Sequence, residues 1–230
     1  LLILSTVHPE HRSVLFVRPR DPEREVWDGA RAGVDGAKER CGVDAAFPMA
    51  ELASKLPGYT SGAPNLYYEI GRNQSLDAEV LRAVNQARGR GRSPKAWPTS
   101  ICHPETLWHE MRLFKDEHEL AALRRAAAIP RDAHVAAMRA SAPGKNEYEI
   151  DALYREVFRR NGSERPAYTP IVGSGPNATV LHYHANNREM QAGELLLVDA
   201  GCEYDYYAAD VTRTWPVSGE FTEPQREIYQ

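Results

Sequence analysis

The sequence predicts an α/β protein, of the α+β kind, that is divided into two domains. Short apolar runs alternate with helical periodicity over residues 1–90, two capped amphipathic helices follow, and a segment rich in branched residues near residue 200 predicts paired strands. Strand–helix alternation of the first kind is typical of an α/β unit. Because the pattern changes near residues 98–104, we expect domains of residues 1–103 and 104–230.

The first domain is predicted from apolar runs that are separated by turn-forming residues. The expected elements are strands over residues 1–5 and 13–17, a short strand and turn over 25–29, a helix over 45–56, a strand over 66–70 and a helix over 76–87. Residues 89–94 are rich in glycine and arginine and are expected to form a loop. The arginines could bind an anion, but such a run is usually a solvated loop.

Two helices are expected at the start of the second domain. Asp116 and Glu119 have the spacing of a capping box, and Asn146 and Glu149 repeat it. Pro130 is expected to end or kink the first helix, because proline removes a backbone donor. The second helix has one apolar face, formed by Ile150, Leu153, Tyr154, Val157 and Phe158. We expect both helices to be scaffold that covers a sheet.

A strand and a glycine-rich loop are expected after these helices. Residues 167–177 predict a strand that runs into Gly-Ser-Gly, where a backbone can approach a ligand closely. The glycine spacing and the lack of a lysine exclude a phosphate-binding loop. Residues 180–184 are expected to be strand-like, which puts His182 and His184 on one face. Either histidine could be a ligand or an ordinary hydrogen-bonding residue.

The segment from Leu195 to Val217 predicts two paired strands that carry the candidate chemistry. With a turn centred on Tyr204–Asp205, Asp199 lies directly opposite Asp210, and opposed Cβ atoms are about 5 Å apart. Two carboxylates held this close repel each other unless a cation lies between them. Hard oxygen ligands suit Mn²⁺, Mg²⁺ or, less selectively, Zn²⁺. The alternative is an exposed hairpin with two solvated acids, although the apolar run before Asp199 favours a buried strand.

The composition excludes several classes of function. Charged residues make up 26% of the 230 residues and the formal net charge is −4, so no nucleic-acid-binding surface is predicted. No apolar run has the length of a membrane span and no signal peptide is visible, so no membrane partner is expected. Cys41, Cys102 and Cys202 are odd in number and widely spaced, which favours a reducing, cytoplasmic compartment.

Several of these motifs, in their order and spacing, resemble aminopeptidase P, a pita-bread-fold metallopeptidase family. They are Ile171-Val172-Gly173-Ser174-Gly175, Leu181-His182-Tyr183, Val198-Asp199-Ala200-Gly201, Asp210-Val211-Thr212-Arg213-Thr214 and the segment 221–229. Residues 13–17 and 109–115 also resemble the family. The resemblance implies the first half of a pita-bread catalytic domain, preceded by part of a creatinase-like amino-terminal domain.

The resemblance also implies roles for individual residues. Asp199 would chelate one of two divalent metal ions and Asp210 would bridge both, with Mn²⁺ the expected metal and Zn²⁺ or Co²⁺ as alternatives. His182 would be catalytic, near the substrate carbonyl, and Tyr168 and Thr212 would support the ligands. The histidine and two glutamates that complete the family's metal site have no match in this chain.

By this resemblance the expected activity is removal of the N-terminal residue from peptides with proline at the second position. A prolidase that cleaves Xaa-Pro dipeptides, a creatinase-like enzyme and a metal-free binding protein on the same fold are the alternatives. A peptide substrate is the expected partner, and a homo-oligomer is the expected assembly. Because the chain starts on an apolar strand and ends inside a helical pattern, we expect a fragment that is inactive alone.

Overall fold

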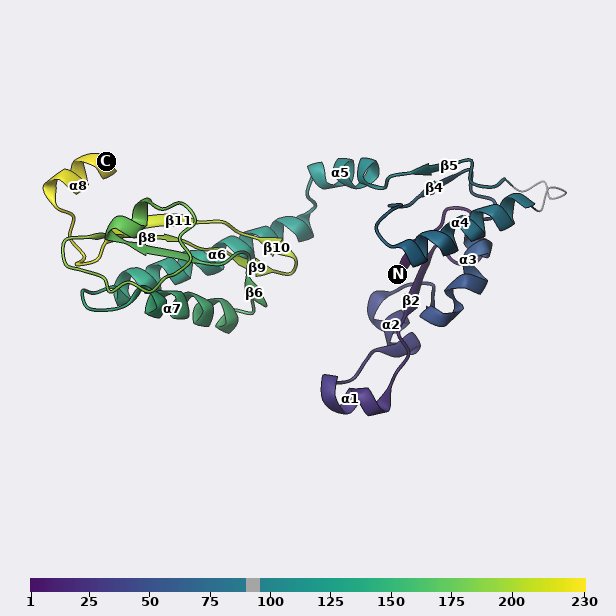
Figure 1. Ribbon diagram of the computed structural model, residues 1–230, viewed down its shortest axis with the longest axis horizontal. Coiled ribbons are helices and arrows are strands. Elements are labelled where there is room, and N and C mark those ends of the chain that lie inside the picture. Colours follow the sequence, from purple (N-terminus) through teal and green to yellow (C-terminus); the bar gives the residue numbers. More distant parts are fainter. Residues whose placement is uncertain (90–95) are drawn as a thin grey trace. The chain divides into compact units, whose positions relative to one another are not determined.

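The structure is a computed structural model that describes residues 1–89 and 96–230 (Figure 1). The chain divides into two compact units, Leu1–Leu113 and Phe114–Gln230. The division lies later than the expected boundary at residue 103, because α5 (Glu105–Leu113), which follows β5 (Ser100–Cys102), belongs to the first unit. Most of the predicted arginine-rich loop lies outside the described residues. In the described part of the chain, no helix is both long and apolar enough to cross a membrane.

The first unit is built on the three-stranded sheet β1–β2–β3. β1 (Leu2–Leu4) pairs antiparallel with β2 (Ser13–Val17), which pairs parallel with β3 (Ala45–Pro48). Between β2 and β3 the chain forms α1 (Pro22–Asp28) and α2 (Gly33–Cys41). η1 (Met49–Glu51), α3 (Leu52–Thr60), β4 (Asn65–Tyr67) and α4 (Gln74–Gly89) complete the unit, with β4 parallel to β5. The buried core is Val14, Phe16, Ala45, Leu52, Leu56, Tyr59, Val80 and Ala83.

Two predictions for this unit are wrong. Residues 25–29 lie largely in α1 and not in a strand, because Asp21 caps the helix by accepting from the Arg24 N–H at 3.2 Å and Pro22 occupies its first turn. Residues 45–48 form β3 and not the start of a helix. Pro48 disfavours a helical backbone at Phe47, and the helix therefore begins only after it.

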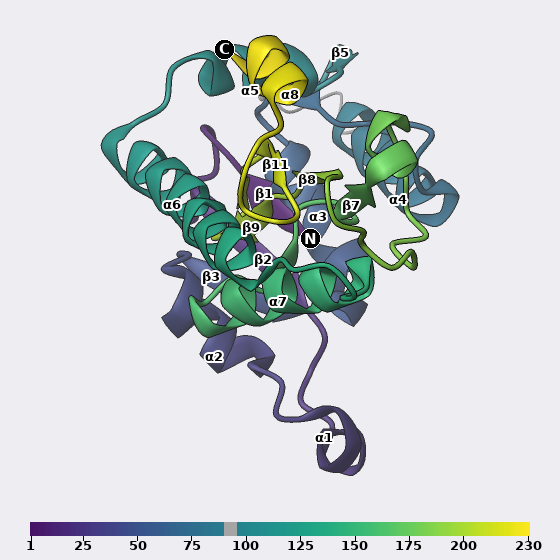
Figure 2. The same cartoon turned by 90° about the vertical axis from the view of Figure 1, so that its left-hand side faces the viewer.

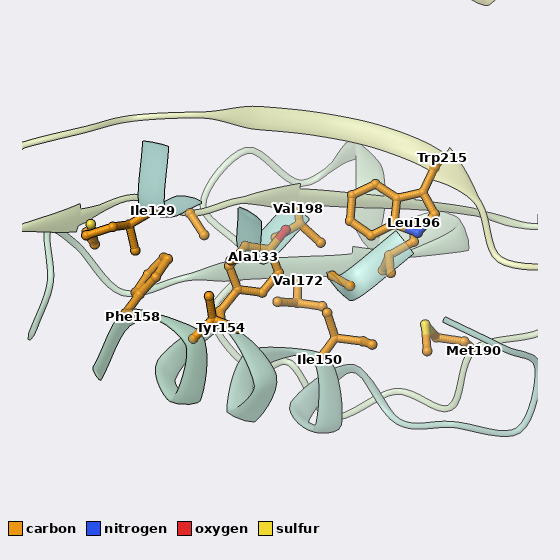
Figure 3. Close-up of a cluster of buried hydrophobic side chains, with 14 of the residues drawn as sticks. Ile129, Ala133, Ile150, Tyr154, Phe158, Val172, Met190, Leu196, Val198 and Trp215 are labelled. Atoms are coloured by element: carbon orange, nitrogen blue, oxygen red, sulfur yellow. The ribbon is translucent and has the colours of Figure 1, made fainter. Parts of the chain in front are cut away.

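The second unit packs two helices against one face of the sheet β11–β8–β7. α6 (Glu117–Ala140) and α7 (Glu147–Arg160) lie together on one side of β7 (Ile171–Ser174), β8 (Leu195–Asp199) and β11 (Thr212–Pro216) (Figures 1 and 2). Figure 3 shows the core between these layers, where side chains of the helices point at those of the strands. Its labelled members are Ile129, Ala133, Ile150, Tyr154, Phe158, Val172, Met190, Leu196, Val198 and Trp215.

Smaller elements close the second unit. β6 (Arg165–Pro166), β9 (Cys202–Tyr204) and β10 (Tyr207–Ala208) form a second sheet in the order β10–β9–β6. η2 (Gly175–Thr179) follows β7, and α8 (Glu223–Tyr229) is the last element. Both predicted capping boxes are confirmed: Glu119 accepts from the Asp116 N–H and Glu149 accepts from the Asn146 N–H.

Pro130 neither ends α6 nor leaves a carbonyl unpaired. The helix continues from Glu117 to Ala140 with Pro130 inside it, so of the two expected effects, an end or a kink, the end is excluded. Proline has no N–H to offer the carbonyl of Ala126, one helical turn earlier. The thiol of Cys202 donates to that carbonyl instead, with Sγ 3.5 Å from the oxygen, and Cys202 is fully buried. A long-range contact therefore replaces the bond that the proline removes.

Candidate metal centre

The hairpin that carries the candidate ligands is shifted from the predicted register. Asp199 pairs with Thr212, and Tyr204 pairs with Tyr207, so the turn is formed by Asp205 and Tyr206. Both turn residues have positive φ, 48° and 66°, as in the two-residue turns that suit tight hairpins. The prediction that Asp199 lies directly opposite Asp210 is therefore wrong. Nothing in the sequence, such as Asn-Gly, marks a turn at these two residues.

The two carboxylates are nevertheless close, because Asp210 lies two residues before Thr212 and so shares its face of the hairpin. The Tyr168 hydroxyl donates to Asp199 Oδ1 and lies 3.2 Å from Asp210 Oδ1. Burial and the two carboxylates raise the pKa of Tyr168, so the phenol stays protonated. A single hydroxyl proton serves two acceptors here, and each carboxylate keeps lone pairs that are free for a cation.

Gly201 allows the hairpin strands to approach each other between the two aspartates. A Cβ built on Gly201 would overlap the carbonyl oxygen of Ala209, which belongs to the opposite strand backbone. The backbone is paired on either side of this point: Ala200 N–H donates to Val211 O at 3.1 Å and Ala209 N–H donates to Cys202 O at 3.0 Å. Only glycine fits at this position, which accounts for its place directly after Asp199-Ala200.

Strand β8 presents Asp199 on the face that the helices do not cover. Leu196 and Val198 are fully buried against the helices, whereas Leu195, Leu197 and Asp199 are half-buried. The apolar run before Asp199 therefore forms a strand with one buried face and not a strand buried on both. This alternation places the carboxylate at the surface of a rigid core, where a solute can reach it.

The two histidines lie on a loop and not on a strand. η2 begins at Gly175, whose φ is +52°, and residues 180–184 continue as a loop, so the expected strand-like run is wrong. The rings of His182 and His184 still stack, with centroids 6.2 Å apart and an interplanar angle of 18°. Both side chains are exposed, and neither ring is hydrogen-bonded to any described residue.

One hollow of about 420 Å³ collects most of the predicted site residues. Its lining residues are Tyr168, Thr169, Ile171, His182, His184, Asp199 and Asp210. His184, which the sequence left open as a ligand or an ordinary polar residue, therefore lines the same hollow as His182. Thr212 lies opposite Asp199 but is exposed and is not among the lining residues.

A buried histidine below the hairpin escaped the sequence analysis. His134 of α6 has Nε2 3.0 Å from the carbonyl oxygen of Val211 and Nδ1 2.6 Å from the Tyr154 hydroxyl. Burial lowers the pKa of His134, so a neutral ring joins the core to the carbonyl group of Val211, the residue after Asp210. The signal by which the sequence could have revealed His134 is a polar residue on the apolar face of a predicted helix.

The donor set fits part of a divalent-metal site. Asp199 and Asp210 offer carboxylate oxygens, which hard cations prefer. Among residues 1–89 and 96–230, no group of three or more histidine, cysteine, aspartate or glutamate side chains could hold a metal ion. Asp199 and Asp210 would therefore supply only some of the ligands of a metal ion, and water or other side chains would have to complete its coordination.

Comparison with known proteins gives two family matches that follow each other along the chain. Residues 1–67 match Aminopeptidase P, N-terminal domain, and residues 121–230 match Metallopeptidase family M24. The "Xaa-Pro aminopeptidase" of Escherichia coli is 42% identical over 229 residues, which are 100% of this chain and 52% of that protein. The chain spans about half the length of the curated relatives that it matches.

Solved structures agree with these matches. The structure of Pseudomonas aeruginosa aminopeptidase PepP superimposes with a TM-score of 0.89 at 40% identity, covering 99% of this chain and 52% of the other. Zn-substituted Escherichia coli aminopeptidase P in complex with product gives a TM-score of 0.85 at 43% identity, covering 95% and 50%.

Proposed function

Because this chain belongs to the aminopeptidase P family of M24 metallopeptidases, we propose that it forms part of a metal-dependent Xaa-Pro aminopeptidase. The reaction is hydrolysis of the peptide bond before a proline at the second position of a peptide. The observation that carries the proposal is the hollow that brings Asp199, Asp210 and His182 together. The names of the relatives favour this activity over the prolidase alternative.

Asp199 and Asp210 are the residues that would hold two divalent metal ions. Carboxylate oxygens suit Mn²⁺, which is our first choice, with Zn²⁺ or Co²⁺ as alternatives. When bound, such ions would lower the pKa of a water molecule and polarise the scissile carbonyl. Tyr168 supports this arrangement because its protonated hydroxyl reaches both carboxylates and can hold their orientation.

His182 would act on the substrate itself. Its ring lines the hollow and is not hydrogen-bonded within the described residues, so it can donate to a substrate oxygen that gains negative charge. Asp199 and Asp210 lie in the same hollow, where they can bind the metal ions or the free amino group of the peptide. The residues of this chain thus divide into two carboxylate ligands and one proton donor.

We further propose that residues 1–230 alone are inactive. Two carboxylates leave most positions around a divalent ion to water, which gives weak binding. The missing ligands would come from a histidine and two glutamates outside this sequence. We keep a homo-oligomeric enzyme and a reducing, cytoplasmic compartment as part of the proposal, the latter supported by three unpaired cysteines.

Titration of the purified chain with Mn²⁺ by calorimetry tests the site. We expect weak binding to the wild type and a loss of at least about tenfold in affinity for Asp210→Asn, because one charged ligand is removed. Asp205→Asn is the matched control, since it removes a carboxylate from the tip of the same hairpin outside the hollow.

Equal Mn²⁺ affinity in the wild type and in Asp210→Asn would contradict the metal site. The same samples, supplied with Mn²⁺ and an Xaa-Pro-Xaa peptide, test the second part of the proposal. We expect no steady release of the first residue from the chain alone. Steady turnover by monodisperse chain would contradict the proposed inactivity while supporting the activity itself.

A further inference from the structure

Glu147 is a fully buried carboxylate at the first position of α7, with 0% of its surface exposed. A buried charge is costly unless hydrogen bonds satisfy it. This one accepts a dense set of bonds at both oxygens. Its donors are Ser174 N–H at 2.7 Å, Ser174 Oγ at 2.7 Å, Asn177 Nδ2 at 3.3 Å, Tyr183 Oη at 2.8 Å and Arg188 N–H at 3.0 Å.

These donors all come from one stretch of chain, residues 174–188. Ser174 ends β7, Asn177 lies in η2, and Tyr183 and Arg188 lie in the loop that leads towards β8. Glu147 also donates its own N–H to the carbonyl oxygen of Arg188 at 3.0 Å. A single residue thus fixes the beginning, the middle and the end of the loop.

The middle attachment lies between the two histidines. Tyr183 separates His182 from His184 in the chain, and its hydroxyl donates to Glu147 Oε2. The tyrosine side chain is therefore directed towards the buried carboxylate while both neighbouring rings line the hollow. Neither histidine ring is hydrogen-bonded within the described residues, so apart from their stacking on each other the rings take their place from the backbone of the loop.

An ion pair between Arg188 and Glu194 supports the same network. Arg188 Nη1 donates to Ser174 Oγ at 3.0 Å, and its guanidinium binds Glu194, with Nη2 2.7 Å from Oε1. Glu194 directly precedes β8, which ends at Asp199. The network therefore joins the start of α7, the histidine loop and the strand that carries a carboxylate of the hollow.

We propose that Glu147 is a positioning residue of the site: through Tyr183, Ser174 and Arg188 it holds the loop that presents His182 and His184 to the hollow. What the histidines then do rests on the function proposed above. The placement of the loop does not, because it follows from the hydrogen bonds of Glu147 and of the residues that it contacts.

Hydrogen exchange of the whole chain with Glu147→Gln tests this placement. Glutamine keeps the size but offers an amide NH₂ to the donors, which leaves several of them unpaired. We expect amides of residues 174–188 to exchange roughly tenfold faster or more, since a hydrogen bond to a charged group is lost. Amides of β8 and β11 should keep their wild-type rates, and ring-proton signals of His182 and His184 should move towards free-histidine values.

Glu149→Gln is the matched control, because it makes the same change two residues later in the same helical turn. Within the described residues, the Glu149 side chain is hydrogen-bonded only in the capping box, where glutamine substitutes well, so the loop should be unaffected. If Glu147→Gln fails to fold, Tyr183→Phe removes one attachment from a partly exposed side chain and should loosen residues 180–188 to a smaller degree. Unchanged exchange there, or a uniform rise over the whole unit, would overturn the proposal.

A kinetic readout in the full-length enzyme separates positioning from general destabilisation. If Glu147 acts through His182, Glu147→Gln should lower kcat and change KM little. In a His182→Ala background the same substitution should cause little further loss of kcat. Additive losses would overturn the positioning role. If the enzyme shows no aminopeptidase activity, the proposed function fails, but the hydrogen-exchange result still tests whether Glu147 positions the loop. The two proposals can therefore fail separately.

Discussion

The carboxylates and the histidines line the same hollow, but the chain fixes them in different ways. Asp199 and Asp210 lie on a hairpin whose position is set by backbone hydrogen bonds between strands. His182 and His184 lie on a loop without strand pairing, held by side-chain bonds to Glu147. Backbone bonds survive most side-chain changes, whereas the loop depends on a few side-chain hydrogen bonds, most of them to Glu147. The hairpin should therefore tolerate substitution at most positions and the loop should not.

The exception on the hairpin is Gly201, where we expect the largest effect. In Gly201→Ala the new methyl group would overlap a backbone oxygen of Ala209, which cannot move away without breaking the pairing. The second unit should lose about 3 kcal/mol or more of unfolding free energy, at or above the usual range for overpacking. Urea unfolding measures this loss, and hydrogen exchange of the β8 amides shows whether it arises at the hairpin.

Gly58→Ala in α3 is the control for that experiment. An added Cβ at Gly58 meets no atom within 4 Å, and alanine is the better helix former. This variant should be as stable as the wild type or more so. Wild-type stability of Gly201→Ala would show that the hairpin strands need not approach this closely, and the contrast between hairpin and loop would weaken.

A smaller effect tests whether the hairpin also relies on side-chain bonds. Tyr154→Phe removes the hydroxyl that faces His134 Nδ1, and His134 in turn holds the carbonyl of Val211 beside Asp210. Leaving a buried polar atom unpaired costs about 1–3 kcal/mol, and we expect a loss in that range by urea unfolding. Tyr148→Phe is the matched control on the same helix, because Tyr148 is 53% exposed. Equal stability of the two variants would contradict the role of this bond.

Local patterns predicted the parts of the fold that depend on neighbouring residues. Short-range rules predict the capping boxes at Asp116 and Asn146, the strand over residues 13–17 and the helix over residues 76–87, which the structure extends to Gln74–Gly89. The helix at residues 22–28 was missed because a proline and a cap outweighed the strand propensity of Val26 and Trp27. Where a competing local signal was present, the stronger one decided the structure.

The candidate site was predicted in its residues but not in its geometry. The register of the hairpin depends on the left-handed backbone of Asp205 and Tyr206. Neither residue predicts that conformation from the sequence as glycine would. Glu147 appears in the sequence only as an acidic residue in the first turn of a helix. Its partners lie 27–41 residues further along the chain, so no local pattern could reveal them.

The pH dependence of the histidine loop is the smallest effect that we expect. Burial alone would raise the pKa of Glu147, but hydrogen bonds from the Arg188 and Ser174 N–H groups, the Ser174 hydroxyl and Tyr183 outweigh it and hold the pKa below the usual 4.5. A carboxylate with a lowered pKa stabilises the folded loop above pH 4.5, and this contribution is lost as the pH falls through the lowered pKa. Protonation removes acceptor capacity from an oxygen that several donors share.

Exchange of amides 174–188, measured from pH of about 7 down to about 3 and corrected for intrinsic rates, tests this dependence. Wild-type protection should be constant above pH 4.5 and should decline below it. Arg188 also lowers the pKa of Glu194, which adds to the decline in the same range. Glu147→Gln separates the two, because it keeps Glu194 and removes the carboxylate that titrates. Its protection should be lower throughout and should decline less on acidification, whereas curves of equal slope would assign the acid sensitivity to Glu194 and contradict the central role of Glu147.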